Sequence, residues 1–223
     1  MRRMLGALLV GVVAAAACQA HALYLIGTGD TVTVVFSDDL APDTRIKEAT
    51  WKKVAGLKLT ARAADGKTTE LTPKLDGPAM TVAAPANTAV VFGTIDYGIS
   101  THGEKPKFIK FYLKRIVGAI PADGGKLDAK TGLDIVSMVE GGKVRFAVYQ
   151  FGKPVAKATV DVMVPEKKEK EKATTDEAGK TTAFDAKGRY GVTVRVSDGK
   201  AGEVKGEKFS ETSHTATLVV DVK

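Results

Sequence analysis

Cysteine and aromatic residues are both scarce in this sequence of 223 residues. Cys18 is the single cysteine, so a mature chain that loses it has no disulfide and depends on packing and on β-ladder hydrogen bonds. Aromatic residues make up 6% of the chain, which is low for a carbohydrate-binding protein. Trp51 and Tyr97 are therefore expected to pack in a core or at a sheet edge rather than to stack on sugars.

Residue patterns that would indicate catalysis are also missing. The sequence contains no G-x-S-x-G motif, and removal of Cys18 leaves no thiol nucleophile. Ser100 and His102 lie two residues apart, but such residues share one face of a strand by default and do not form a triad. We expect a protein that is not an enzyme.

Long apolar runs are absent except at the N-terminus. Two arginines stand among the first three residues, and residues 5–17 then form an uncharged run of about 13 residues followed by small side chains. This run is shorter than the ~20 residues of a membrane-spanning helix. The pattern is typical of a secretory signal peptide over residues 1–20, which predicts a periplasmic or secreted protein with no transmembrane segment in its mature chain.

Three cleavage sites fit the signal region. A cut after Ala20 makes His21 the first residue, whereas a cut after Ala22 removes that histidine. The segment 15–18 resembles a lipobox without its usual leucine, and its use would make Cys18 a lipidated first residue of an outer-membrane lipoprotein.

The charge of the chain is modest and mixed. The formal net charge of +7 falls to +5 without Arg2 and Arg3, and lysines alternate with acids in the run 166–172. Nucleic-acid binding would need an uninterrupted basic patch with aromatic residues, so the composition favours a solvated surface or an anionic envelope neighbour.

Alternation of apolar and polar residues predicts short β-strands separated by turns, over residues 31–36, 57–62, 108–113, 143–149, 158–164, 188–196 and 215–222. No mature segment keeps a helical apolar period for three turns, and the nearest candidate is residues 44–54. The charged run 165–172 is expected to be a solvated hairpin loop.

A break without apolar alternation falls at residues 121–132, where Pro, Gly, Asp and Lys dominate. We therefore predict an all-β protein with two immunoglobulin-like or transthyretin-like β-sandwich modules. The first covers residues 21–120, the second covers residues 133–223, and residues 121–132 link them.

The order of motifs in the second module resembles a carboxypeptidase-regulatory or transthyretin-like sandwich; the motifs are Gly152-Lys153-Pro154-Val155, Ala158-Thr159-Val160, Thr175-Asp176 with Gly179, and Gly188-Arg189-Tyr190. With the start at His21 and the segment around His214, the whole chain resembles a periplasmic family of two-sandwich proteins labelled as nickel or cobalt uptake accessory proteins. Ala22 and Leu23 replace the acidic and aromatic residues that usually follow the first histidine there. The resemblance implies metal handling and carries over only His21 and His214.

His21 is the strongest candidate metal ligand. If the cut falls after Ala20, its terminal amine and imidazole can chelate one Cu²⁺ or Ni²⁺, because both nitrogens are borderline donors for late divalent metals. His214 or His102 would then complete a three-nitrogen site. The alternative interpretation gives these histidines ordinary roles in the cleavage region, a polar turn and a strand.

A weaker candidate is an oxygen site for Ca²⁺ formed by Asp38, Asp39 and Asp43. Their spacing does not match a calcium-binding loop, and acids before a proline are more often turn formers.

Two functions follow from these observations. The first is an exported binding or accessory protein that captures Ni, Co or Cu and delivers it to a membrane transporter component or to the envelope surface. The second is a structural or adhesive envelope spacer that binds no ligand.

Overall fold

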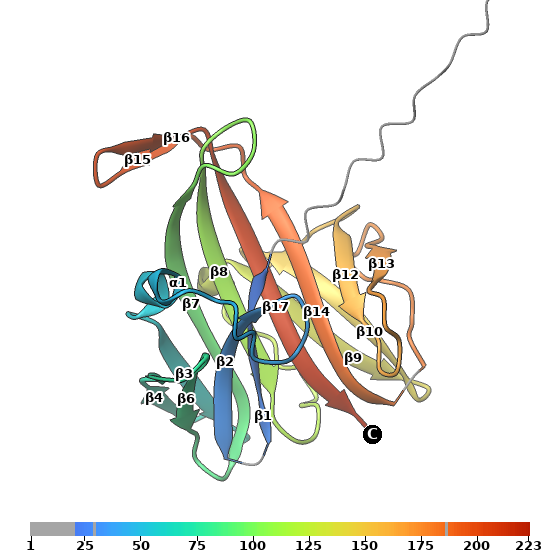
Figure 1. The fold of residues 1–223 in the computed structure, drawn as a ribbon. Coiled ribbons are helices and arrows are strands. Elements are labelled where there is room, and N and C mark those ends of the chain that lie inside the picture. The colour runs from blue at the N-terminus through green and yellow to red at the C-terminus, as the bar shows by residue number, and fades with distance from the viewer. Residues whose placement is uncertain (1–20, 29, 186) are drawn as a thin grey trace, which may run out of the picture.

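β-Strands dominate the computed structural model, which describes residues 21–28, 30–185 and 187–223 (Figure 1). The predicted signal peptide and Cys18 lie outside the described residues. The described part contains one α-helix, α1 (Glu48–Val54), and one 3₁₀ turn, η1 (Ala129–Thr131). The predicted all-β sandwich class is therefore confirmed, and α1 lies inside the segment 44–54 that came nearest to a helical pattern.

The strands before residue 121 are β1 (Ala22–Thr28), β2 (Thr31–Ser37), β3 (Lys58–Ala63), β4 (Thr68–Leu71), β5 (Lys74–Asp76), β6 (Ala79–Ala83), β7 (Thr88–Ser100) and β8 (Lys107–Ile116). Those after residue 132 are β9 (Leu133–Glu140), β10 (Lys143–Gln150), β11 (Lys153–Pro154), β12 (Thr159–Met163), β13 (Glu171–Thr174), β14 (Gly188–Ser197), β15 (Gly202–Val204), β16 (Glu207–Phe209) and β17 (Glu211–Val222).

One long sheet organises the molecule. Its eight strands follow the order β13-β12-β14-β17-β8-β7-β3-β4, and β8 and β17 pair in parallel at its centre. Two smaller sheets have the orders β1-β2-β6-β5 and β11-β10-β9, and β15 and β16 form a separate hairpin. The other paired strands described are antiparallel, as expected for connections made by short turns.

The two smaller sheets cover opposite faces of the long sheet. Successive side chains of a strand point to opposite faces, and Val219 of β17 packs with residues of β1 and β2. Its neighbours Leu218 and Val220 pack instead with Ile135 of β9 and Phe146 of β10. The centre of the molecule is therefore a three-layer structure in which β8 and β17 are covered on both sides.

Each smaller sheet encloses its own hydrophobic core against the long sheet. One core comes mainly from residues 22–113, and the other mainly from residues 112–222. The strands of both predicted modules nevertheless share the long sheet, because β8 pairs with β17. The division into modules with a linker at 121–132 stays a prediction about folding units.

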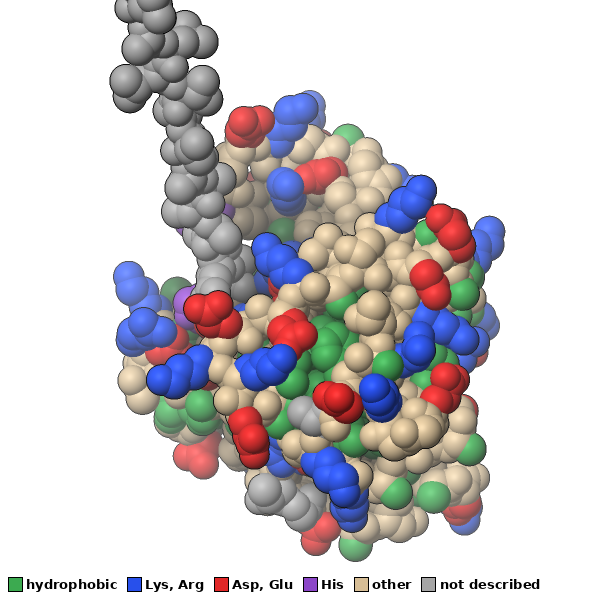
Figure 2. Space-filling model, turned by 90° about the vertical axis from the view of Figure 1, so that its right-hand side faces the viewer, with side chains coloured by type: hydrophobic (Ala, Val, Ile, Leu, Met, Phe, Trp, Pro, Cys, Tyr) green, Lys and Arg blue, Asp and Glu red, His purple; other side chains and the backbone are tan. Residues whose placement is uncertain are grey.

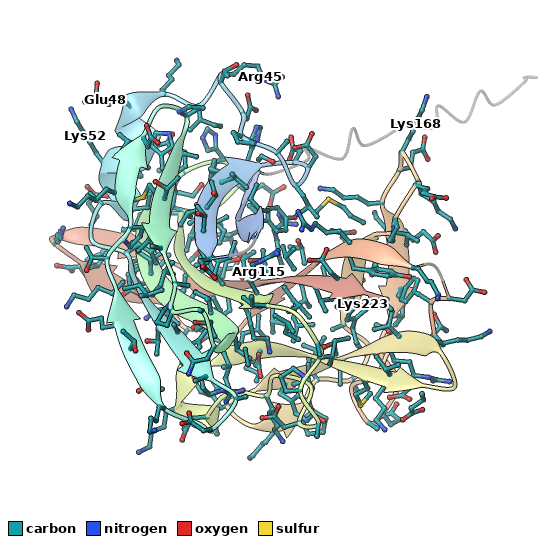
Figure 3. All side chains as sticks on the ribbon, turned by 90° about the horizontal axis from the view of Figure 1, so that it is seen from below. Arg45, Glu48, Lys52, Arg115, Lys168 and Lys223 are labelled. Carbon is teal, nitrogen blue, oxygen red and sulfur yellow. The ribbon has the colours of Figure 1, made fainter. Side chains whose placement is uncertain are left out.

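The loops agree with local residue chemistry. Residues 165–170 of the charged run form the turn between the antiparallel strands β12 and β13, as expected for a hairpin, and Glu171 and Lys172 are the first residues of β13. Lys168 projects away from the body (Figure 3). Figure 2 shows basic and acidic side chains interspersed over one face. None of the helices in the described ranges has the length and apolar character needed to cross a bilayer.

Polar groups fasten β1 to the long sheet on one face. Thr217 donates from its hydroxyl to the carbonyl oxygen of Leu23 at 2.7 Å, and the hydroxyls of Tyr24 and Thr193 lie 2.6 Å apart in the interior. These bonds supply partners for buried polar groups that would otherwise destabilise the layer.

Two arginines bind the end of β1 in the same layer. The guanidinium groups of Arg115 and Arg189 both donate to the carbonyl oxygen of Gly27 and to the carboxylate of Asp221. Arg115 lies inside the molecule between the layers (Figure 3). Burial tends to raise the pKa of Asp221, but the Arg189 hydrogen bond and the two positive charges hold it below its usual value. Gly27 allows this arrangement because it has a φ of +133° and a Cβ there would lie 2.0 Å from the oxygen of Thr31.

A buried ion pair fastens the other face. The ammonium group of Lys114 contacts the carboxylate of Asp134 and also donates to the carbonyl oxygen of Gly125 at 3.1 Å. The second oxygen of Asp134 accepts the backbone N–H of Leu127 at 3.0 Å. The pair thus joins β8, β9 and the loop between them.

Loss of one partner of this ion pair should destabilise the fold strongly. In Asp134→Ala the buried ammonium group of Lys114 loses its carboxylate, and we expect the free energy of unfolding to fall by about 3–5 kcal/mol in urea titrations. The double variant Lys114→Met/Asp134→Leu removes both charges and should recover most of that loss.

The matched control is the surface pair of Lys58 and Glu70, whose side chains are 66% and 62% exposed. Lys58→Met should change the free energy of unfolding by less than about 1 kcal/mol. An Asp134→Ala variant that loses no more stability than this control would contradict the stabilising role of the buried ion pair.

Candidate functional site

The three predicted histidines lie in three different environments. His21 is half-buried at the start of β1, His102 is exposed in the loop between β7 and β8, and His214 is buried on β17. They have different polar partners, so the described structure does not gather them into the predicted three-nitrogen site. No group of three or more His, Cys, Asp or Glu side chains within residues 21–28, 30–185 and 187–223 is arranged to hold a metal ion.

The β1–β2 hairpin places His21 beside an acidic loop. Ala22 pairs with Ser37 in this hairpin, so the residue before β1 and the residue after β2 become neighbours. His21 Nδ1 lies 3.5 Å from Asp38 Oδ2, and its Nε2 lies 3.2 Å from Asp43 Oδ2. The imidazole also stacks on Phe36, with ring centroids 5.7 Å apart and an angle of 14° between the planes.

Asp43 is fixed as a charged acceptor. Arg45 Nη2 donates to its Oδ2 at 2.7 Å, Arg45 Nε donates to its Oδ1 at 2.9 Å, and the Arg45 backbone N–H adds a bond of 2.9 Å. These bonds, together with the weaker one from His21, hold the pKa of Asp43 well below its usual range. Both ring nitrogens face carboxylates, which only accept hydrogen bonds, but the contact of Nε2 with Asp43 is the shorter one, at 3.2 Å against 3.5 Å for Nδ1 with Asp38, so the proton of a neutral His21 ring is assigned to Nε2.

That tautomer leaves an unpaired acceptor on each side of a short gap. Nδ1 of a neutral His21 carries a lone pair and faces Asp38, whose Oδ1 is buried without a hydrogen-bond partner. Two facing acceptors are favourable only when a proton or a metal cation lies between them. With a neutral ring, His21 Nδ1 and Asp38 Oδ2 therefore form a pair of facing acceptors 3.5 Å apart in the described structure.

The acids predicted as a calcium site have separate roles. Asp39 forms a turn, because its Oδ1 accepts the hydroxyl of Ser37 and the backbone N–H of Ala41, each at 3.0 Å. Asp38 and Asp43 instead flank His21. The histidine and the acids stand out in the sequence, but their proximity does not, because it depends on the register of the β1–β2 hairpin.

His214 forms a separate buried chain of hydrogen bonds. Its Nδ1 lies 2.7 Å from the hydroxyl of Tyr112, and its Nε2 lies 3.3 Å from Asp198 Oδ2. Burial tends to raise the pKa of Asp198, but the hydrogen bonds from the Lys200 backbone N–H and from His214 outweigh it and hold this pKa below its usual value. Asp198 therefore accepts a hydrogen bond from His214. In the tautomer that fits these partners, Nε2 of His214 donates to Asp198 and Nδ1 accepts from the Tyr112 hydroxyl. Burial raises the pKa of Tyr112 to about 12.

The other residues considered from sequence lie in packing or in loops. Trp51 is on the buried side of α1, in a hydrophobic core, and Tyr97 stacks on Phe36 with ring centroids 5.9 Å apart. The Ser100 hydroxyl accepts the backbone N–H of His102 at 3.4 Å, and no hydrogen bond between the two side chains is present in the described loop.

Comparison with known proteins assigns no family. No family model matches the chain, and no curated protein matches it. Among solved structures, a segment of two fibronectin type-III domains from chicken tenascin is 11% identical, with a TM-score of 0.22, over 87% of this chain and 96% of that chain. Pullulanase type I from Bacillus subtilis str. 168, complexed with maltose, is 16% identical, with a TM-score of 0.20, over 86% of this chain.

The match covers 26% of the pullulanase chain, so this chain spans about a quarter of that enzyme. Likenesses at these TM-scores carry no argument about fold or function. The assignment to the β-sandwich class rests on the sheets themselves.

The protonation of His21 can be tested directly. In neutral His21 we expect the proton on Nε2, because Asp43 accepts it, and long-range ¹H–¹⁵N correlation spectra should show one tautomer. Asp43→Asn should give a mixture of tautomers, whereas Asp39→Asn should leave the His21 signals unchanged. A proton found on Nδ1 in the unaltered protein would contradict the proposed role of Asp43.

Proposed function

We propose that the protein is an exported accessory protein that binds a divalent late transition metal, Ni, Co or Cu, at His21. The single observation that carries the proposal is the pair of facing acceptors, His21 Nδ1 and Asp38 Oδ2, with Asp43 behind the ring. The proposal requires cleavage after Ala20, which gives His21 a free terminal amine. Amine, imidazole and carboxylate would then supply two nitrogens and one oxygen to one ion.

The distance between the two side-chain donors is compatible with a shared ion. Nitrogen and oxygen ligands lie about 2.0–2.2 Å from a divalent transition metal, so a separation of 3.5 Å places both within reach of one ion at an open ligand angle. The buried and unpartnered Oδ1 of Asp38 supports the same interpretation, because a metal would neutralise this carboxylate.

Asp43 supports the site from behind the ring. A carboxylate that accepts the second N–H of a ligating imidazole fixes the ring orientation and makes the other nitrogen a better ligand. The bidentate contact with Arg45 holds Asp43 in place, and the stack on Phe36 limits rotation of the ring. The donor set of imidazole and amine nitrogens favours Cu²⁺ and Ni²⁺ over harder ions such as Mg²⁺.

In this proposal the ion is cargo, delivered to a membrane transporter component or to the envelope surface. The resemblance of the chain to the nickel and cobalt accessory family, which carries over His21 but not the acidic and aromatic residues that follow it there, supports this assignment. The periplasm is the proposed location, with an outer-membrane lipoprotein as the alternative if Cys18 is the first residue. A lipoprotein that begins at Cys18 would lack the free amine at His21.

The test compares two forms of the protein by calorimetric titration with Ni²⁺ and Cu²⁺. One begins at His21, as verified by N-terminal sequencing, and the other retains Ala20. We expect the form that begins at His21 to bind at least about tenfold more tightly and to show a higher melting temperature with metal. Asp38→Ala should weaken binding by at least about tenfold.

The matched control is His102→Ala, which removes an exposed histidine and should leave affinity unchanged. If His21→Ala binds as tightly as the unaltered protein, the site is elsewhere and the proposal fails. If no metal binds or shifts the melting temperature, the spacer interpretation is favoured instead.

A further inference from the structure

A hollow of about 390 Å³ lies where β17 begins, on the face of the long sheet that β9, β10 and β11 cover. Its floor is a row of polar side chains from three adjacent strands: Asp96 of β7, Lys110 of β8 and His214 of β17 stand side by side in the sheet register. Its wall is made by the turn after η1 and by Phe151, in the turn between β10 and β11. The hollow is on the opposite face from the β1–β2 layer that carries His21.

Hydrogen bonds fix the orientation of His214 in this floor. The chain from Tyr112 through His214 to Asp198 orients all three side chains, and the Tyr112 and His214 rings stack with centroids 5.7 Å apart. Gly132 lies so close above the Tyr112 ring that a Cβ there would be 2.6 Å from a ring carbon. Rigid polar groups of this kind preorganise a binding surface.

Phe151 combines a strained backbone conformation with an exposed aromatic ring. Its φ is +50°, a conformation that is unfavourable for a bulky residue, and its side chain is 53% exposed. The ring stands edge-on to His214, at 6.2 Å between centroids, and the backbone N–H donates to the carbonyl oxygen of Gly132 at 2.7 Å. The two-residue turn of Phe151 and Gly152 between β10 and β11 requires a positive φ at both positions. Glycine would adopt the first of them without strain, so the presence of an exposed aromatic ring there points to a role for the ring.

The charges around the hollow are balanced. Asp96 pairs with Lys110 at 2.9 Å, and Asp198 and Lys130 add one charge of each sign. Such a lining does not select a ligand with net charge, but it offers both donors and acceptors. A neutral molecule with many hydroxyl groups and one apolar face matches this combination of polar floor and exposed ring.

We propose that this hollow binds a neutral carbohydrate, with the apolar face of one sugar ring on Phe151 and its hydroxyls on Asp96, Lys110 and Asp198. This function is separate from metal binding at His21. The low aromatic content argues against an extended sugar-stacking surface. As expected from it, Trp51 and Tyr97 pack within the protein. A single exposed ring over a polar floor is sufficient for one sugar unit.

The test follows the backbone amides of Gly132, Phe151 and His214 by NMR in the ¹⁵N-labelled protein. The probes are glucose, galactose, mannose, N-acetylglucosamine, cellobiose and chitobiose, with inorganic phosphate and acetate as charged comparators. We expect at least one sugar to shift these amides in a saturable manner, and we expect neither anion to do so.

Two variants separate binding from folding. Phe151→Gly should weaken the bound sugar by at least about tenfold while its melting temperature stays at or above that of the unaltered protein, because the backbone strain is relieved. Asp96→Ala should also weaken binding. The matched control is Leu75→Ala on β5, which removes a side chain that is 50% exposed in another sheet and should leave affinity unchanged.

Three results would overturn the proposal: no sugar shifts these amides, only the anions shift them, or Phe151→Gly binds the sugar as tightly as the unaltered protein. A lower melting temperature in Phe151→Gly would also count against it, because the ring would then be needed for packing.

Discussion

The parallel pair of β8 and β17 is the interaction on which the rest of the structure depends. Both strands lie at the centre of the eight-stranded sheet, and each is covered by a smaller sheet on either face. A strand buried on both faces has no solvated side, so each polar group on it needs a partner within the protein. The ion pair of Lys114 and Asp134 supplies partners on one face. On the other face Arg115 bonds through Nη2 to Asp221 and to the carbonyl oxygen of Gly27, while its Nη1 is buried without a hydrogen-bond partner among the described residues.

The same constraint explains where the candidate sites lie. Along the middle of β17 the residues are buried and mostly apolar, and polar chemistry is concentrated near its ends. His214 stands near the beginning of β17 and forms part of the floor of the Phe151 hollow. His21 precedes β1, at the point where the hairpin brings the loop after β2 alongside. The rigid sheets thus position these histidines, and short loops supply the neighbouring residues of each site.

Local patterns in the sequence predicted several of the strands but not others, such as β1 and β9. The alternation at 143–149 and 215–222 is read within a few residues, and both segments are strands, β10 and β17. The parallel partnership of β8 with β17 joins segments about 100 residues apart. A local pattern carries no information about such a partner or its register, so the shared sheet was not foreseen.

The candidate sites were predictable to different degrees. His21 was visible because an imidazole beside a cleavage site has recognisable chemistry, but Asp38 as its partner depends on the hairpin register. The hollow at Phe151 was missed because sequence alone shows neither the exposure of a ring nor a positive φ. His214 was noticed as a possible ligand, while its partners Tyr112 and Asp198 come from strands and turns distant in the sequence.

Native-state hydrogen exchange tests the central claim most directly. If the doubly covered pair holds the molecule together, the amides of β8 and β17 should be the most protected, and they should exchange only through global unfolding. Their opening free energy should then equal the free energy of unfolding from urea titration. Exchange of these two strands at a clearly lower free energy, with the cores on either side unfolding independently, would contradict the account.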